Sequence, residues 1–144
     1  MKFVPETLTG VNMISRHEGA SDRSSERSHA PGEAGGASAR LWVGGTEFSR
    51  SVFVPWLGAV TPWAVSRWED LAAADFERMA AFEPELVIFG SGDRMRFAPP
   101  SLLRPLALRR IGIECMDTAA ACRTYNVLVA ERRPVLAALL LGVA

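Results

Sequence analysis

Residues 111–141 read IGIECMDTAAACRTYNVLVAERRPVLAALLL and specify most of the architecture. The short apolar runs at 111–116 and 135–141 are typical of buried strands. Between them, Asp117 and Thr118 offer N-caps for a helix that fills the intervening segment. The stretch is therefore a strand–helix–strand unit, which predicts two parallel strands joined by a helical crossover.

The preceding sequence adds elements of the same kinds. ELVIFG (85–90) is another short apolar run, suited to a central strand buried on both faces. Ser66 and Glu69 form a capping box, which predicts that a helix starts there, and Pro84 marks its end. The proline pair at 99–100 predicts a second, shorter helix.

A β-hairpin is predicted nearer the N-terminus. Leu41 and Val43 alternate with their neighbours, Gly44–Gly45 turns the chain, and residues 48–54 are rich in strand formers. Taken with the strand–helix alternation downstream, this predicts an α/β fold of three layers. We expect a central mixed, mostly parallel sheet with helices on its faces and an N-terminal β-hairpin at an antiparallel edge.

A length of 144 residues suits a single domain, residues 1–144. Within it, residues 17–39 (HEGASDRSSERSHAPGEAGGASA) hold no bulky apolar side chain, which predicts a disordered insertion loop. That loop contains both histidines, His17 and His29. Because Ser–His–Asp and Cys–His mechanisms need an ordered histidine, we expect the chain not to be an enzyme.

Charge and cysteine content argue against several other classes of function. The 16 basic and 16 acidic residues give no net charge, so we expect no nucleic-acid partner. Cys115 and Cys122 lie in predicted buried elements at a spacing unlike zinc or redox motifs, which favours free thiols over a disulfide. We expect no metal and no other cofactor. No apolar run suits a signal peptide or a membrane span, which predicts a cytoplasmic protein.

Two loops are candidates for a ligand site, because each follows a predicted strand where open α/β sheets bind ligands. The glycines at 90 and 92 lack the third glycine of a dinucleotide fingerprint, since Met95 stands in its place. A plain tight turn, a helix cap at Asp117 and a solvated Arg123 remain the alternatives. The candidate ligand-binding residues are Gly90, Ser91, Gly92, Asp117, Thr118 and Arg123.

The segments GIECMDTAAACRTYNVLVAERR (112–133), LVIFGSG (86–92) and SVFV (51–54) carry a resemblance. They resemble a small family of largely uncharacterised α/β domains that includes mitochondrial NADH:ubiquinone oxidoreductase (complex I) assembly factor 3 and stand-alone bacterial and archaeal relatives. The resemblance covers residues 1–16 and 40–144 and implies a three-layer fold with a central mixed sheet. It implies no enzymatic activity.

The resemblance implies a non-catalytic binding protein that assists assembly of a respiratory or other membrane-associated complex, with NADH dehydrogenase subunits as candidate partners. The aromatic-rich segment 53–68 is expected to be exposed, so Trp56 and Trp63 are the candidate partner-binding residues. The alternative is a small-molecule or anion-binding domain, or a modest enzyme, that uses the two loops above. A third interpretation is self-association through an edge strand.

Overall fold

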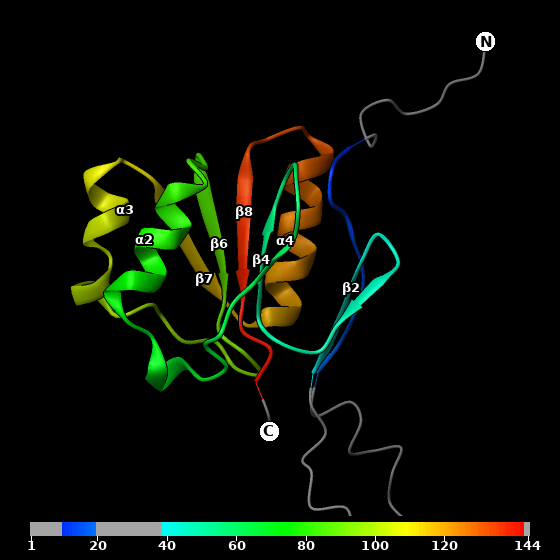
Figure 1. Cartoon of the computed structure of the whole chain (residues 1–144), viewed down its shortest axis with the longest axis horizontal. Helices are drawn as coiled ribbons and strands as arrows, with labels where there is room; N and C mark the ends of the chain where they lie inside the picture. The colour runs from blue at the N-terminus through cyan, green and yellow to red at the C-terminus, as the bar shows by residue number, and fades with distance from the viewer. Residues whose placement is uncertain (1–9, 20–38, 143–144) are drawn as a thin grey trace, which may run out of the picture.

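The computed structural model describes residues 10–19 and 39–142, which form two β-sheets and three α-helices (Figure 1). Most of the predicted disordered loop, residues 20–38, lies outside the described residues. Its first residues belong to an ordered element instead, because His17 and Glu18 complete strand β1 (Ile14–Glu18). His17 pairs with Leu41 of the neighbouring strand, so the predicted N-terminal boundary of the loop is wrong.

The larger sheet has five strands, in the order β5 (Thr61–Pro62), β4 (Val52–Pro55), β8 (Val135–Leu139), β6 (Leu86–Gly90) and β7 (Gly112–Met116). Strand β6 runs parallel to β7 and β8, because helices connect these strands as the sequence pattern predicts. Strand β4 runs antiparallel to β8 and β5. The sheet is therefore mixed, as predicted, but it is not mostly parallel, since β4 and β5 extend it beside β8.

The smaller sheet is antiparallel and consists of β1, β2 (Arg40–Val43) and β3 (Thr46–Phe48). Gly44 and Gly45 connect β2 to β3 with φ angles of 55° and 89°, which suit a two-residue hairpin turn. The predicted hairpin and its turn are confirmed, but its second strand is β3 instead of residues 48–54, most of which belong to the larger sheet or the connection to it. The hairpin does not form the edge of the central sheet, however, because the other side of β2 pairs with β1.

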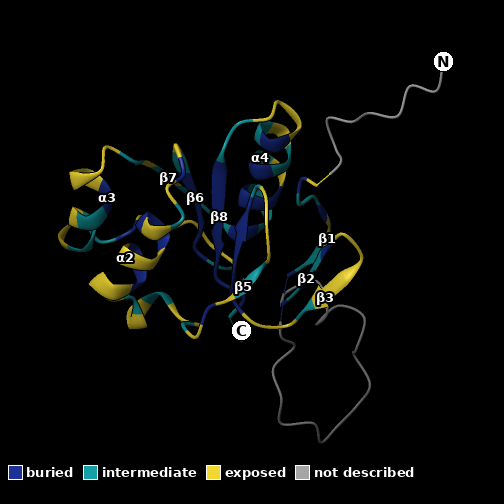
Figure 2. Ribbon diagram, turned by 45° about the horizontal axis from the view of Figure 1, so that its top comes forward, coloured by how far each residue is buried: buried dark blue, intermediate teal, exposed yellow. Residues whose placement is uncertain are grey.

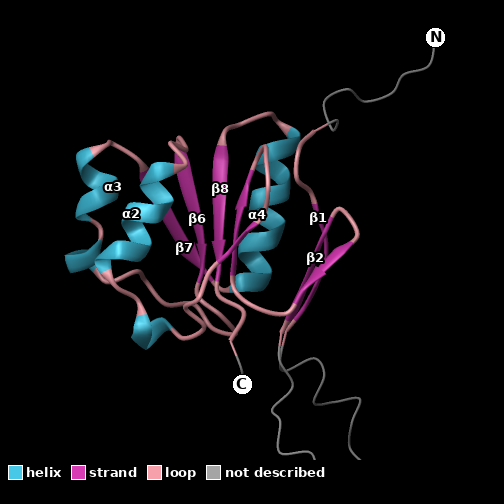
Figure 3. Ribbon diagram, viewed as in Figure 1, coloured by secondary structure: helices cyan, strands magenta, loops and turns pink. Residues whose placement is uncertain are grey.

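The helices cover both faces of the larger sheet (Figures 1 and 3). Helices α2 (Ala73–Ala81) and α3 (Arg104–Leu108) lie on one face, and α4 (Thr118–Ala130) lies on the other, between the two sheets. Alternate strand residues reach the two cores: Ile88 packs in the α4 cluster, whereas Val87 and Phe89 pack in the α2 cluster. The central strands are therefore buried on both sides (Figure 2).

Helix α4 forms as the sequence predicts. The Asp117 carboxylate caps it by accepting a hydrogen bond from the Ala120 N–H at 2.8 Å. Its buried face includes Ala121, Tyr125 and Val129. At 13 residues it is the longest described helix, and no helix within residues 10–19 and 39–142 combines the length and apolarity needed to span a membrane.

The helix predicted to start at Ser66 starts later. The capping box does not form, because the Glu69 carboxylate accepts a hydrogen bond from the Arg96 side chain at 2.8 Å instead. Helix α2 begins only after a short 3-10 turn, where the Asp75 carboxylate accepts from the Ala72 N–H at 2.8 Å. A contact between distant segments therefore overrides the local capping signal.

Strand β7 is at the edge of the sheet, although its apolar sequence predicted a buried strand. Gly112 and Glu114 are exposed, and only β6 pairs with it. The crossover through α4 carries the chain back past β6, so β8 takes the interior position. The apolar sequence patterns of β7 and β8 are alike, so they did not indicate which of the two strands lies at the edge of the sheet.

Candidate functional site

The two loops that the sequence singled out meet at the carboxyl ends of β6 and β7. The Gly92 N–H donates to Thr118 Oγ1 at 2.8 Å, and the Thr118 N–H donates to the Gly92 carbonyl at 2.9 Å. The Ser91 N–H donates to the Met116 carbonyl at 2.9 Å. In a phosphate-binding loop, backbone N–H groups of this kind point at the phosphate. Here these three N–H groups already bond to the neighbouring loop, so they do not face a ligand.

The close packing of the loops explains the two glycines. A Cβ at Gly90 would lie 3.0 Å from both Cα and Oγ1 of Thr118, which is tighter than an ordinary contact. Gly92 has a φ of 101°, in the region that favours glycine. Packing of α4 against the end of β6 therefore accounts for Gly90, and the backbone conformation accounts for Gly92, without a ligand.

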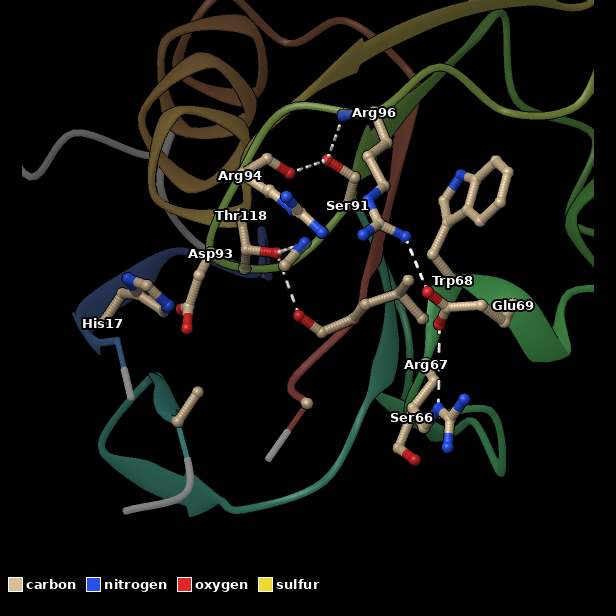
Figure 4. A pocket seen from close by; sticks show the side chains of 14 residues that line it. His17, Ser66, Arg67, Trp68, Glu69, Ser91, Asp93, Arg94, Arg96 and Thr118 are labelled. Atoms are coloured by element: carbon tan, nitrogen blue, oxygen red, sulfur yellow. Dashed lines mark hydrogen bonds and ion pairs between the residues drawn. The ribbon is translucent and has the colours of Figure 1, made fainter. Parts of the chain in front are cut away.

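A cavity of 280 Å³ opens beside these loops (Figure 4). Ser91, Gly92 and Thr118 line part of it, together with Leu140 and Gly142, which follow β8. Its position, next to the carboxyl ends of parallel strands, is where open α/β sheets bind ligands. The charged and aromatic side chains that complete its lining are His17, Arg67, Trp68, Glu69, Asp93, Arg94 and Arg96.

Arg96 is fixed at the rim of this cavity. Its backbone N–H donates to Ser91 Oγ at 2.9 Å. Its side chain donates to Glu69, and its guanidinium carbon lies 5.3 Å from the centre of the Trp68 ring. The hydrogen bond from Arg96 is the main reason that the pKa of the Glu69 carboxyl is lowered. Trp68 Nε1 in turn donates to the Phe97 carbonyl at 2.9 Å, and this hydrogen bond holds the loop that follows β6 in place.

Arg94 differs from Arg96 in its side-chain contacts. Its backbone carbonyl accepts from Ser91 Oγ at 2.7 Å, which holds the backbone in place. Its guanidinium, by contrast, makes no hydrogen bond or ion pair with any residue in the described part of the chain. Figure 4 shows the Arg94 side chain among those that line the cavity. Arg94 therefore presents a cation to the cavity.

The other sequence candidates lie apart from the cavity lining. Arg123 is exposed on α4 and lines a separate hollow with Cys122 and Asn126. Asp117 caps α4, and Gly90 is buried behind Thr118. The expected polar pocket of Asp117, Thr118 and Arg123 is therefore not assembled around one cavity.

The two tryptophans proposed for partner binding differ in exposure. Trp63 is only 2% exposed, stacks on Phe53 with ring centres 4.6 Å apart, and donates from Nε1 to Asp75 at 2.9 Å. Its expected surface position is wrong, because these contacts bury it in the α2 core. Trp56 is half-buried and packs against the α4 core. The segment 53–68 is thus not an exposed aromatic surface.

Sequence reasoning missed the arginines of the cavity. Arg94 and Arg96 alternate in the loop directly after β6, which is a signal that a search for charged residues at strand ends would have found. Arg67 carries no comparable local signal, since it does not directly follow a strand. It reaches the same cavity because its segment packs beside the loop, a long-range contact that no local pattern predicts.

Both cysteines are free thiols. Burial raises the pKa of the Cys122 thiol to about 12, and it also raises the pKa of Cys115, whose Sγ accepts from the Ala98 N–H. Such thiols are weak nucleophiles at neutral pH. Within the described ranges, no three His, Cys, Asp or Glu side chains gather closely enough to hold a metal ion.

Comparison with known proteins places these features in a family. The family described as "Protein of unknown function (DUF498/DUF598)" matches residues 35–140. NADH dehydrogenase (ubiquinone) 1 alpha subcomplex assembly factor 3 of Bos taurus is 37% identical over 84 residues, which are 57% of this chain and 46% of that protein. The chain thus spans about half the length of the curated relatives it matches.

Solved structures share the fold over nearly the whole chain. A Bordetella parapertussis protein is 32% identical, with a TM-score of 0.72, over 94% of this chain and 99% of that chain. A Bordetella pertussis protein described as an Mth938-like domain is 28% identical, with a TM-score of 0.71, over 100% of this chain and 95% of that chain. The mixed α/β architecture is therefore the one that this family shares.

Proposed function

This chain belongs to the DUF498/DUF598 family, and from that premise we propose a non-catalytic binding protein that assists assembly of a respiratory complex. The observation that carries the proposal is the 37% identity to an assembly factor of NADH dehydrogenase. The proposed partners are NADH dehydrogenase subunits or those of another membrane-associated complex. The proposed location is the cytoplasm, at the membrane where such a complex is built.

The loop after β6 offers a surface for such a partner. Phe97 is 71% exposed and Met95 is 44% exposed, and the bond from Trp68 Nε1 to the Phe97 carbonyl fixes their backbone. Exposed aromatic side chains on a rigid loop are typical of binding hot spots. Of the two tryptophans in segment 53–68 proposed for partner binding, only Trp56 remains a candidate, together with the adjacent and partly exposed Leu57.

The test is to delete the gene in the source organism and to measure assembled NADH dehydrogenase on native gels. We expect less assembled enzyme and more free subunits, both restored by the full-length chain. A tagged copy should retain NADH dehydrogenase subunits from gently solubilised membranes. Normal assembly in the deletion strain, with no subunit retained on the tagged copy, would contradict the proposal.

Matched variants separate a partner contact from general loss of structure. Phe97→Ala and Trp56→Ala should reduce the retention of subunits while the circular dichroism spectrum stays unchanged. Leu108→Ala is the control, because Leu108 is also 71% exposed but lies on α3, next to a different groove. Equal retention by all three variants would show that neither surface contacts the partner.

A further inference from the structure

We propose that the cavity at the end of β6 binds a small oxyanion, a carboxylate- or phosphate-bearing molecule, with Arg94 as the main binding residue. The inference goes beyond the assembly role and does not depend on it. We refer below to the cavity lined by Ser91, Gly92, Thr118, Arg67, Arg94 and Arg96 as the arginine cavity.

The charge of the arginine cavity favours an anion. Among the described residues, three guanidinium groups line it against the two carboxylates of Glu69 and Asp93, in a chain whose overall charge is zero. Glu69 is already engaged: it accepts from Arg96 at 2.8 Å and lies 3.6 Å from the Arg67 side chain. The guanidinium of Arg94 is left for a ligand, and guanidinium groups bind carboxylate and phosphate in a bidentate fork.

The site is preorganised by contacts that do not involve a ligand. The Ser91 hydroxyl accepts from the Arg96 N–H and donates to the Arg94 carbonyl, so one buried side chain fixes the backbone at both arginines. The Thr118 hydroxyl fixes the floor by bridging the Gly92 N–H and the Leu140 carbonyl. The backbone at Arg94 therefore loses little freedom when an anion binds, and only the side chain has to be ordered.

Size narrows the class of ligand. A volume of 280 Å³ lies just below about 300–1,000 Å³, the usual range for small-molecule sites. The loops also keep their backbone donors bonded to one another, which leaves no phosphate cradle of the dinucleotide type. Recognition would therefore rest on side-chain charge, and the ligand would be a small acid or phosphate ester instead of a dinucleotide.

The experiment is a nuclear magnetic resonance titration of the full chain, in separate series with inorganic phosphate and with malonate, at constant ionic strength. We expect saturable shifts of the Gly92, Arg94 and Thr118 amides with at least one probe. The probe that binds more tightly distinguishes phosphate from carboxylate as the preferred group. The absence of saturable shifts with both probes would overturn the inference.

Two variants test the role of Arg94. Arg94→Ala should weaken binding by about tenfold or more, because a charge-assisted pair is lost. Arg104→Ala, which removes an exposed arginine from α3, should leave the affinity unchanged. Since neither side chain has a structural role in the described fold, both variants should keep the wild-type spectrum. Equal affinities for the two variants would overturn the assignment.

Discussion

Thr118 joins three segments that are far apart in the sequence. Its hydroxyl accepts from the Gly92 N–H at 2.8 Å and donates to the Leu140 carbonyl at 2.9 Å. The side chain is only 2% exposed, so water does not replace these bonds when they are lost. One hydroxyl therefore links the ends of β6 and β8 to the start of α4.

Replacement of Thr118 by Val should show how much the two hydrogen bonds of the hydroxyl contribute to stability. The shape is preserved, but a partly buried N–H and a buried carbonyl lose their partner, which should lower the free energy of unfolding by about 1–3 kcal/mol. Urea denaturation provides the measurement. Thr118→Ser keeps the hydroxyl and should lose less; a smaller loss for Val than for Ser would show that the methyl group stabilises the site more than the hydroxyl does.

Cys122 should make stability depend on pH in the alkaline range. Burial raises the pKa of its thiol to about 12, from an ordinary value of 9.0, so the unfolded chain releases its proton first. Its contribution is fully present below pH 9 and is lost as pH rises toward 12, by about 1.4 kcal/mol per unit. Urea denaturation at several pH values checks this. Cys122→Ala should have a shallower slope; an unchanged slope would refute the assignment.

Sequence patterns predicted residue roles well where the cause is local. Asp117 caps α4 because a helix N-terminus needs an acceptor at that position, whatever surrounds it. Trp63 was misplaced, because its burial depends on Phe53 and Asp75, which only the folded chain brings to it. The Arg94 guanidinium likewise has no partner among the described residues because Glu69 pairs with its neighbour Arg96, which no local pattern predicts.

At the scale of elements, Asn126 attaches the smaller sheet to α4. Its Nδ2 donates to the Ile14 carbonyl at 2.7 Å, and its Oδ1 accepts from the Ile14 N–H at 2.9 Å. The amide side chain thus pairs with β1 as a neighbouring strand would. The Tyr125 hydroxyl adds a bond to the Asn12 carbonyl at 2.7 Å. A helix residue therefore completes the hydrogen bonding of a strand edge.

Asn126→Ala should release β1 before the rest of the fold. Both backbone groups of the buried Ile14 lose their partners, which predicts a loss of about 2–3 kcal/mol and faster hydrogen exchange at the Ile14 amide. Asn126→Asp retains the acceptor and should protect that amide better. Unchanged exchange at Ile14 in the Ala variant would contradict this role.

Element positions followed from sequence more reliably than element boundaries and neighbours. Strands β6, β7 and β8 and helix α4 fall where apolar runs and caps place them. The start of α2 was missed because Glu69 binds Arg96, and the edge position of β7 was missed because strand order depends on which face each crossover takes. Both errors arise from tertiary contacts that periodicity does not encode.

At the scale of the whole molecule, one set of strands supports both cores. Alternate residues of β4, β6 and β8 enter the α2 cluster and the α4 cluster, and the α4 cluster continues into the smaller sheet through Leu41 and Val43. The two cores therefore share the central strands of the larger sheet, and only the α4 cluster also includes residues of the smaller sheet. This sharing predicts that both cores and both sheets unfold together, as a single cooperative unit.

Substitutions at opposite ends of the molecule test that prediction. Met79 on α2 and Leu41 in the smaller sheet are fully buried and belong to different clusters. Met79→Ala and Leu41→Ala should each cost about 2–5 kcal/mol, and their effects should add in the double variant, because the sites are far apart. In every variant, tryptophan fluorescence and circular dichroism should report one coincident urea transition. If Leu41→Ala instead split the transition, with only the smaller sheet lost early, that sheet would be an independent unit docked on α4.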